Sequence, residues 1–224
     1  MEKIFYKILI SSLVVFFATT AIAKPPVENL YFIKQKLIAY HDSGQYGKDI
    51  AAVFAQATAY LDQRVKENQA SGNKQRLAVV MDIDETSLSN YAEIQTEDFG
   101  GTSTELDQAI MQGQDPAIPP ALAFYQHALN QGVTVFFVTG RKEYMRAGTA
   151  KNLQAVGYKT WQQLFLKPND YNESSVVPYK SGTRQQIEQQ GYDVILTIGD
   201  QYSDLQGGYA DKTFKVPNPY YYIP

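Results

Sequence analysis

Residues 77–91 read LAVVMDIDETSLSNY. The valine-rich apolar run at the start of this segment predicts a buried strand that ends at residue 81. Carboxylate and hydroxyl side chains follow directly, from Asp82 to Thr86. In open α/β sheets, ligands bind at the carboxyl ends of the strands. The segment therefore predicts a functional site at the point where this strand leaves its sheet.

Two later apolar segments end in the same way. The predicted strand 133–138 is followed by Thr139-Gly140-Arg141, and the predicted strand 194–198 is followed by a segment that holds Asp200 and Asp204. Because the carboxyl ends of parallel strands meet at one edge of a sheet, we expect these side chains to lie close to Asp82 and Asp84.

The intervening segments predict the fold class. Helical patterns over about 119–131, 144–156 and 180–190 alternate with the strands and with a short strand at 164–166. Such alternation predicts an α/β fold, a Rossmann-like three-layer sandwich with a mostly parallel central sheet. We expect one domain over residues 24–224, with an amino-terminal helical region at 27–70 and a small helical cap inserted at about 91–118. The tail at 218–224 is predicted to lie extended against the core.

The amino terminus predicts export. Lys3 and Lys7 precede the apolar run 8–17, and Ala21-Ile22-Ala23 has the small residues of a signal-peptidase site. Residues 1–23 are therefore interpreted as a signal peptide cleaved after Ala23, with a periplasmic or secreted mature protein. The alternative is an uncleaved anchor, but the apolar run is shorter than the ~20 residues of a spanning helix. We expect no stable membrane anchor after cleavage.

The amino-acid composition excludes or disfavours several classes of function. The 224 residues carry a formal net charge of −3, which disfavours binding to a nucleic-acid polymer, and no cysteine, which excludes thiol catalysis. Only two histidines, His41 and His127, are present, so a zinc site or a histidine nucleophile is disfavoured. We expect both histidines to be structural or solvent-facing. A homo-oligomer is compatible with the sequence.

The acidic strand ends predict a metal-assisted phosphoryl transfer. Four converging carboxylates, Asp82, Asp84, Asp200 and Asp204, would repel one another unless a hard divalent cation such as Mg²⁺ bound them. Asp82 would then attack phosphorus and become a covalent aspartyl-phosphate, and Asp84 would act as general acid and base.

Polar groups at the neighbouring strand ends would complete this site. Thr139 and Gly140 would hold a phosphate oxygen, and so would a lysine, either Lys180 or Lys167. Lys180 is preferred, because it is predicted to open a helix. Arg141 would contact the substrate or pair with a carboxylate, and Glu85 is expected to form a structural hydrogen bond.

The four segments resemble the ordered motifs of a known family. The DIDET segment at 82–86, the VTGR segment at 138–141, the lysine of PYK at 178–180 and the GDQYSD segment at 199–204 are similar to the haloacid dehalogenase (HAD) superfamily. The form of the first motif resembles subfamily IIIB, the class B and class C acid phosphatases, which include plant vegetative storage proteins. This resemblance implies a Rossmann-like core, Mg²⁺ dependence and phosphomonoester hydrolysis.

The sequence is compatible with three functions. The first is a secreted acid phosphatase acting on small phosphomonoesters such as nucleoside monophosphates or aryl phosphates. The others are a storage or binding protein with weak catalysis on the same scaffold, and a phosphotransferase. Tyr91, Phe99 and Tyr125 would either stack on a base or aryl group of the substrate or serve only in packing.

Overall fold

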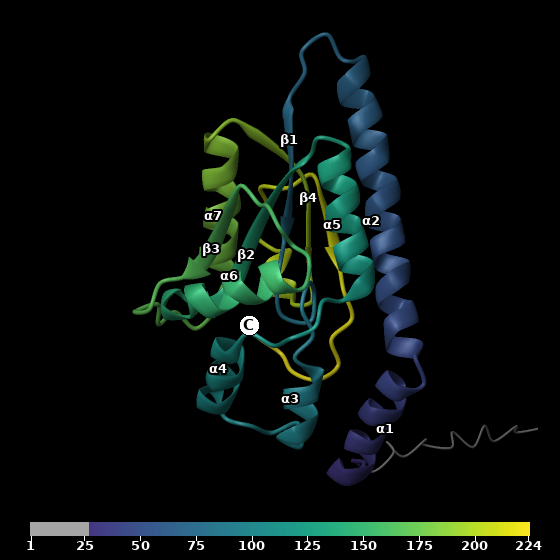
Figure 1. Ribbon diagram of the computed structural model, residues 1–224, viewed down its shortest axis with the longest axis vertical. Coiled ribbons are helices and arrows are strands. Elements are labelled where there is room, and N and C mark those ends of the chain that lie inside the picture. The colour runs from purple at the N-terminus through teal and green to yellow at the C-terminus, as the bar shows by residue number, and fades with distance from the viewer. Residues whose placement is uncertain (1–26) are drawn as a thin grey trace, which may run out of the picture.

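A computed structural model describes residues 27–224, and the predicted signal peptide lies outside the described residues. A sheet of five parallel strands forms the centre of the molecule in the order β3-β2-β1-β4-β5 (Figure 1). The strands are β1 (Arg76–Met81), β2 (Thr134–Lys142), β3 (Gln163–Lys167), β4 (Tyr192–Gly199) and β5 (Lys212–Lys215). The predicted α/β class with a parallel central sheet is therefore confirmed, and the strand that precedes Asp82 lies in the middle.

One strand was not predicted. β5 has the sequence KTFK and pairs with β4 at the edge of the sheet. Edge strands are commonly short and carry lysine, so the hydrophobic pattern that identifies buried strands is weak in them.

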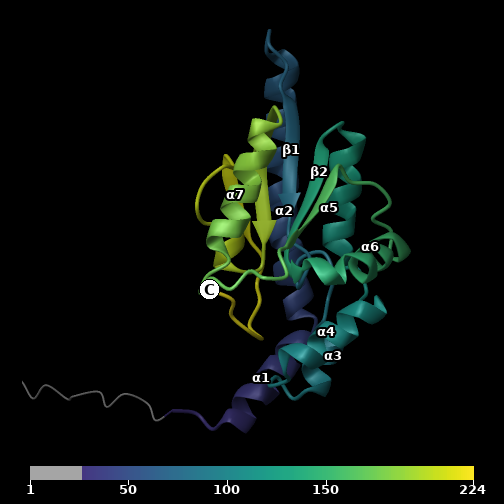
Figure 2. The same cartoon turned by 90° about the vertical axis from the view of Figure 1, so that its left-hand side faces the viewer.

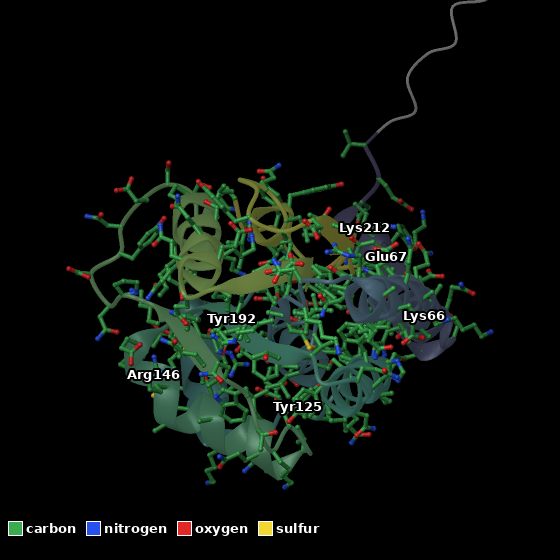
Figure 3. All side chains as sticks on the ribbon, turned by 90° about the horizontal axis from the view of Figure 1, so that it is seen from above. Lys66, Glu67, Tyr125, Arg146, Tyr192 and Lys212 are labelled. Carbon is green, nitrogen blue, oxygen red and sulfur yellow. The ribbon has the colours of Figure 1, made fainter. Side chains whose placement is uncertain are left out.

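Helices cover both faces of the sheet. The helices α2 (Gln45–Ala70) and α5 (Pro119–Asn130) pack on one face, and α7 (Val177–Gln189) packs on the other (Figure 2). Alternation along β1 separates the two cores, since Val79 and Met81 belong to the larger cluster and Val80 belongs to the smaller one. Figure 3 looks from above and labels Tyr125, from the larger cluster, and Tyr192, from the smaller one.

The amino-terminal helices lie outside the sheet. The face of α2 that the three- and four-residue spacing predicts is buried, and it includes Phe54, Ala57 and Leu61. The preceding helix, α1 (Leu30–Asp42), has no buried residue. Within the described part of the chain, no helix has both the length and the apolar character needed to cross a membrane.

Two short helices lie beyond the carboxyl ends of the strands. They are α3 (Tyr91–Thr96) and α4 (Ser103–Gln112), in the region where a cap was expected (Figure 1). A capping box between Thr102 and Glu105 begins α4. α4 packs against α6 (Arg146–Ala155) and the 3-10 turn η1 (Glu143–Met145), so this helix contacts the segment that follows β2.

Candidate active site

The ends of β1 and β4 bring three aspartates together. The amide of Asp82 donates to the carbonyl of Ile198 at 3.0 Å, which holds the residue after β1 against β4. Carboxylate oxygens of Asp82, Asp200 and Asp204 all lie within 4.8 Å of one another, and the three residues are buried. A Cβ atom on Gly199 would lie 2.4 Å from Cβ of Asp204, so only glycine allows this close approach.

Lys180 lies between two of these carboxylates. Its Nζ donates to Oδ1 of Asp82 at 2.8 Å and also contacts Oδ1 of Asp204. Burial alone would lower the pKa of Lys180, but the charges of Asp204 and Asp82 outweigh it and raise that pKa. The ammonium group is therefore charged. α7 begins at Val177 and not at Lys180 as expected, so Lys180 lies within its first turn.

The aspartate group fits a divalent cation. Three carboxylates against one ammonium leave an excess of negative charge among buried groups, and their oxygens are hard ligands. Burial and the charge of Asp204 raise the pKa of Asp82 and raise that of Asp200 to about 7. Asp84, also predicted as a metal ligand, is not a member of this group.

The Asp84 carboxyl group is held by an arginine. Its Oδ1 accepts from Nη2 of Arg141 at 2.8 Å and from Nδ2 of Asn90 at 2.8 Å, and its Oδ2 lies 3.4 Å from the Thr139 hydroxyl. Burial would raise the pKa of Asp84, but Arg141 holds it below its ordinary value. Of the two roles expected for Arg141, the structure shows the pairing with a carboxylate.

Arg141 has a second carboxylate partner that was not predicted from the sequence. Asp115, from the segment between α4 and α5, is buried and accepts from Nη2 of Arg141 at 3.3 Å. Asn152 of α6 fixes its backbone at both ends, because the amide of Asp115 donates to Asn152 Oδ1 and its carbonyl accepts from Asn152 Nδ2. No sequence motif marks Asp115, and only its place beside β2 reveals its role.

The buried Asp115 carboxyl predicts a pH dependence of stability. Burial raises its pKa to about 6, although Arg141 opposes the shift. The folded state thus binds this proton more tightly than the unfolded state, and stability falls as pH rises from the ordinary value of 3.8 to about 6. In urea unfolding across this range, we expect Asp115→Asn to gain on the order of 2 kcal/mol relative to the wild type. The exposed variant Asp170→Asn serves as control, and a constant difference between Asp115→Asn and wild type would contradict the prediction.

The carboxyl-terminal tail completes the site. Asn218 donates through Nδ2 to Oδ2 of Asp200 at 2.6 Å, and the Tyr221 hydroxyl donates to Oε2 of Glu85 at 2.6 Å. The amide of Ile223 donates to the side chain of Gln201 at 3.0 Å. The tail therefore lies against the core, as expected, but it also orients a candidate metal ligand, which the sequence did not predict.

Glu85 forms the expected structural hydrogen bonds. Its Oε1 accepts from the amide of Asn90 at 2.7 Å. Its φ angle of 48° is in the left-handed region, which is unfavourable for a residue with a side chain. This local cost is consistent with a turn held by its surroundings, because Tyr221 and Asn90 both bind the Glu85 carboxyl group.

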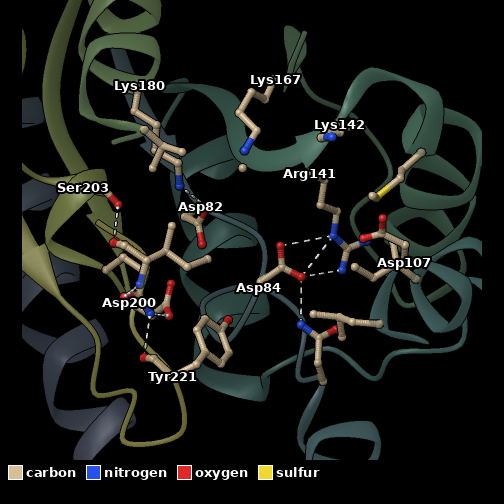
Figure 4. A pocket seen from close by; sticks show the side chains of 18 residues that line it. Asp82, Asp84, Asp107, Arg141, Lys142, Lys167, Lys180, Asp200, Ser203 and Tyr221 are labelled. Carbon is tan, nitrogen blue, oxygen red and sulfur yellow. Dashed lines mark hydrogen bonds and ion pairs between the residues drawn. The ribbon is translucent and has the colours of Figure 1, made fainter. Parts of the chain in front are cut away.

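A cavity of about 290 Å³ opens onto these groups (Figure 4). Asp82, Asp84, Lys180 and Asp200 line it together with Gly140 and with Lys167. Thr139 is fully buried and does not line the cavity, although it was expected to hold phosphate.

The candidate stacking residues also lie away from this cavity. None of Tyr91, Phe99 and Tyr125 lines it. Tyr91 stacks on His41, and His127 contacts Asp62, so neither histidine lies at the site. Packing, the second role considered for the three aromatic residues, is the one the structure shows.

Fold and site together define an α/β protein with an aspartate-centred site at the carboxyl edge of a parallel sheet. The family profile described as HAD superfamily, subfamily IIIB (acid phosphatase) matches residues 20–224, and the chain belongs to this family. The resemblance noted in the sequence is thereby confirmed. The class C acid phosphatase from Bacillus anthracis has the same fold, with a TM-score of 0.66 and 22% identity over 84% of this chain and 86% of that one.

Plant proteins are similar in sequence. The stem 28 kDa glycoprotein of Glycine max is 39% identical over 64% of this chain and 59% of its own length. Acid phosphatase 1 of Solanum lycopersicum is 35% identical over 68% of this chain and 61% of its own length. Vegetative storage protein 2 of Arabidopsis thaliana is 33% identical over 65% and 56%, respectively. The matched segments thus span less than two thirds of each of these three relatives.

Proposed function

We propose that this protein is an exported, Mg²⁺-dependent acid phosphatase that hydrolyses small phosphomonoesters through an aspartyl-phosphate on Asp82. The observation that carries the proposal is the contact of Lys180 with Asp82 inside a cavity that also exposes Asp84 and Asp200. A nucleophile, a fixed cation, an acid–base carboxyl and a cation-binding group are thus within one small space. Family membership supports the same chemistry.

The residues of the chain divide the reaction into two steps. In the first, a carboxylate oxygen of Asp82 bonds to phosphorus, the bond from phosphorus to the leaving oxygen breaks, and the protonated form of Asp84, which Arg141 keeps a minor one, gives that oxygen a proton. In the second, Asp84 takes a proton from water, the water oxygen bonds to phosphorus, and the bond to Asp82 breaks.

Fixed charge assists both steps. Lys180 stabilises the negative charge on the phosphoryl oxygens, and Arg141 and Asn90 keep the Asp84 carboxyl oriented. Asp82, Asp200 and Asp204 would hold Mg²⁺, which supplies further neutralisation of phosphoryl charge when bound.

Removal of the metal tests the proposal. We expect EDTA to reduce p-nitrophenyl phosphate hydrolysis by at least about 100-fold, because loss of one electrostatic element commonly costs this much. Added Mg²⁺ should restore the rate, and NaCl at equal ionic strength serves as control. Turnover that persists in EDTA would contradict the metal requirement.

The second candidate function is that of a storage or binding protein with weak catalysis, and the similarity to vegetative storage proteins favours it. It predicts little turnover of p-nitrophenyl phosphate or of nucleoside monophosphates even with Mg²⁺ present. The intact set of Asp82, Asp84 and Lys180 in one cavity argues for the phosphatase.

A further inference from the structure

Two lysines at the rim of the cavity, Lys142 and Lys167, have no role in the two reaction steps proposed for Asp82 and Asp84. Lys142 is the last residue of β2, Lys167 is the last residue of β3, and the two are partners in the sheet. Both are half-buried and both line the cavity. In the view of Figure 4, the Lys167 amine lies between Lys180 and Lys142 and points toward the cavity.

An irregularity in β2 creates this pairing. Thr139 pairs with Leu166, and the next pair is Lys142 with Lys167, so β2 contains two extra residues opposite a single step of β3. The extra residues are Gly140 and Arg141, and Arg141 reaches Asp84 from this position. Bulges often redirect side chains next to active sites. This one aims Arg141 at the acid–base carboxyl and sets Lys142 beside Lys167.

The pairing of two like charges is unfavourable by itself. Two positive charges held close together at neighbouring strand ends repel each other. Burial lowers the pKa of Lys167, and the charges of Lys142 and Lys180 lower it further, while the charge of Asp107 partly opposes these effects. A local cost of this kind at the mouth of a cavity is expected where function requires the charges.

No carboxylate neutralises either lysine among the side chains that the structure describes in residues 27–224. Lys180 and Arg141 each form ion pairs with two carboxylates, whereas neither Lys142 nor Lys167 forms one. The acidic residue across the cavity, Asp107 of α4, is bound by the Tyr144 hydroxyl. The cavity thus has ion-paired cations beside Asp82 and Asp84 and two ammonium groups without an ion-paired carboxylate at its rim, of which Lys167 also lies 5.5 Å from the ring centroid of Tyr171.

We propose that Lys142 and Lys167 form a second anion subsite that binds a second phosphate group of the substrate. The inference rests on the proposed function, since the first phosphate occupies the floor beside Asp82. Preferred substrates are then small bisphosphates in which a few atoms separate the two phosphates. The cavity of about 290 Å³ suits such a compact ligand, because it is slightly smaller than the roughly 300–1,000 Å³ usual for ligand pockets.

A substrate series tests the subsite. The kcat/KM values of propyl phosphate, trimethylene bisphosphate and hexamethylene bisphosphate are compared in the presence of Mg²⁺. We expect the trimethylene compound to exceed propyl phosphate by at least about tenfold, as one charge-assisted contact provides. General attraction of anions to the basic rim would instead favour both bisphosphates equally, since their charges are the same. Equal preference would overturn the proposal.

Variants assign the effect to the two lysines. In Lys142→Gln/Lys167→Gln, we expect the preference for trimethylene bisphosphate over propyl phosphate to fall to about threefold or less. The exposed α6 variant Lys151→Gln should keep the full preference. A double variant that retains the preference, or a control that loses it equally, would refute the subsite.

Calorimetry separates this proposal from the proposed function. Binding of trimethylene bisphosphate is measured for the wild type and for the double variant, whatever their turnover. If the wild type hydrolyses no phosphomonoester but binds the compound at least about tenfold more tightly than the double variant, the phosphatase proposal fails and the subsite stands. If turnover is present but the two proteins bind equally, the subsite fails alone.

Discussion

Replacement of Asp82 by asparagine is expected to abolish p-nitrophenyl phosphate hydrolysis and to leave the fold intact. The amide cannot form the acyl-phosphate bond, so we expect kcat to fall by at least about 10⁴-fold, as for other nucleophile deletions. The measurement is the steady-state rate with Mg²⁺, together with the circular dichroism spectrum of the variant. Asp170→Asn, at an exposed loop position, serves as the matched control.

The same variant makes a prediction about stability. Asp82 is buried, and Asp204 and Asp200 repel its charge, while Lys180 attracts it. Asparagine keeps the shape of the Asp82 side chain and removes its repulsion by Asp204 and Asp200. In EDTA at neutral pH, the unfolding temperature of the variant should therefore be no lower than that of the wild type. Retained turnover by a correctly folded Asp82→Asn would remove Asp82 as the nucleophile.

Replacement of Lys180 by methionine is expected to affect both stability and activity. Two buried carboxylates, Asp82 and Asp204, lose their shared cation. Breaking a buried ion pair from one side commonly costs about 3–5 kcal/mol, and we expect a loss of this size in urea unfolding without metal. Hydrolysis should fall by at least about 10²-fold, because the phosphoryl oxygens lose a fixed positive charge.

Two further measurements make this result specific. Mg²⁺ should restore part of the stability of Lys180→Met, since a divalent cation neutralises the same carboxylates. The exposed variant Lys66→Met should change neither property. If Lys180→Met retains activity and Lys167→Met loses it, the phosphate-binding role belongs to Lys167.

Local hydrophobic pattern was sufficient to predict the first four strands along the chain, β1 to β4, and the acidic residues that follow β1 and β4. Strand 77–81 is a continuous apolar run that breaks at Asp82, and this break is visible without coordinates. The same logic failed for β5 and for the start of α7. Neither has a strong apolar period, so their limits depend on pairing with β4 and on the loop that leads to Val177.

The residue types in the sequence did not predict which side chains contact each site residue. Asp84 was predicted as a metal ligand because it is one of four carboxylates expected to converge at the strand ends, and the bulge in β2 brings Arg141 to its carboxyl group. Neither Asp115 nor Asn218 belongs to a recognisable sequence motif. Asp115 reaches the site from the segment between α4 and α5, and Asn218 reaches it from the carboxyl-terminal tail.

The amino-acid sequence alone predicted the class of the protein and a candidate set of site aspartates, with Lys180 preferred to Lys167, because apolar periodicity and polar residues at strand ends are local properties. Only the tertiary structure decided which charges neutralise one another. Lys180 contacts Asp82, which lies 98 residues away in the chain. Arg141 forms ion pairs with two carboxylates, whereas Lys142 and Lys167 form none with the described residues. Ion pairing depends on distances of a few ångströms between segments far apart in the chain, and these distances exist only after the sheet has formed.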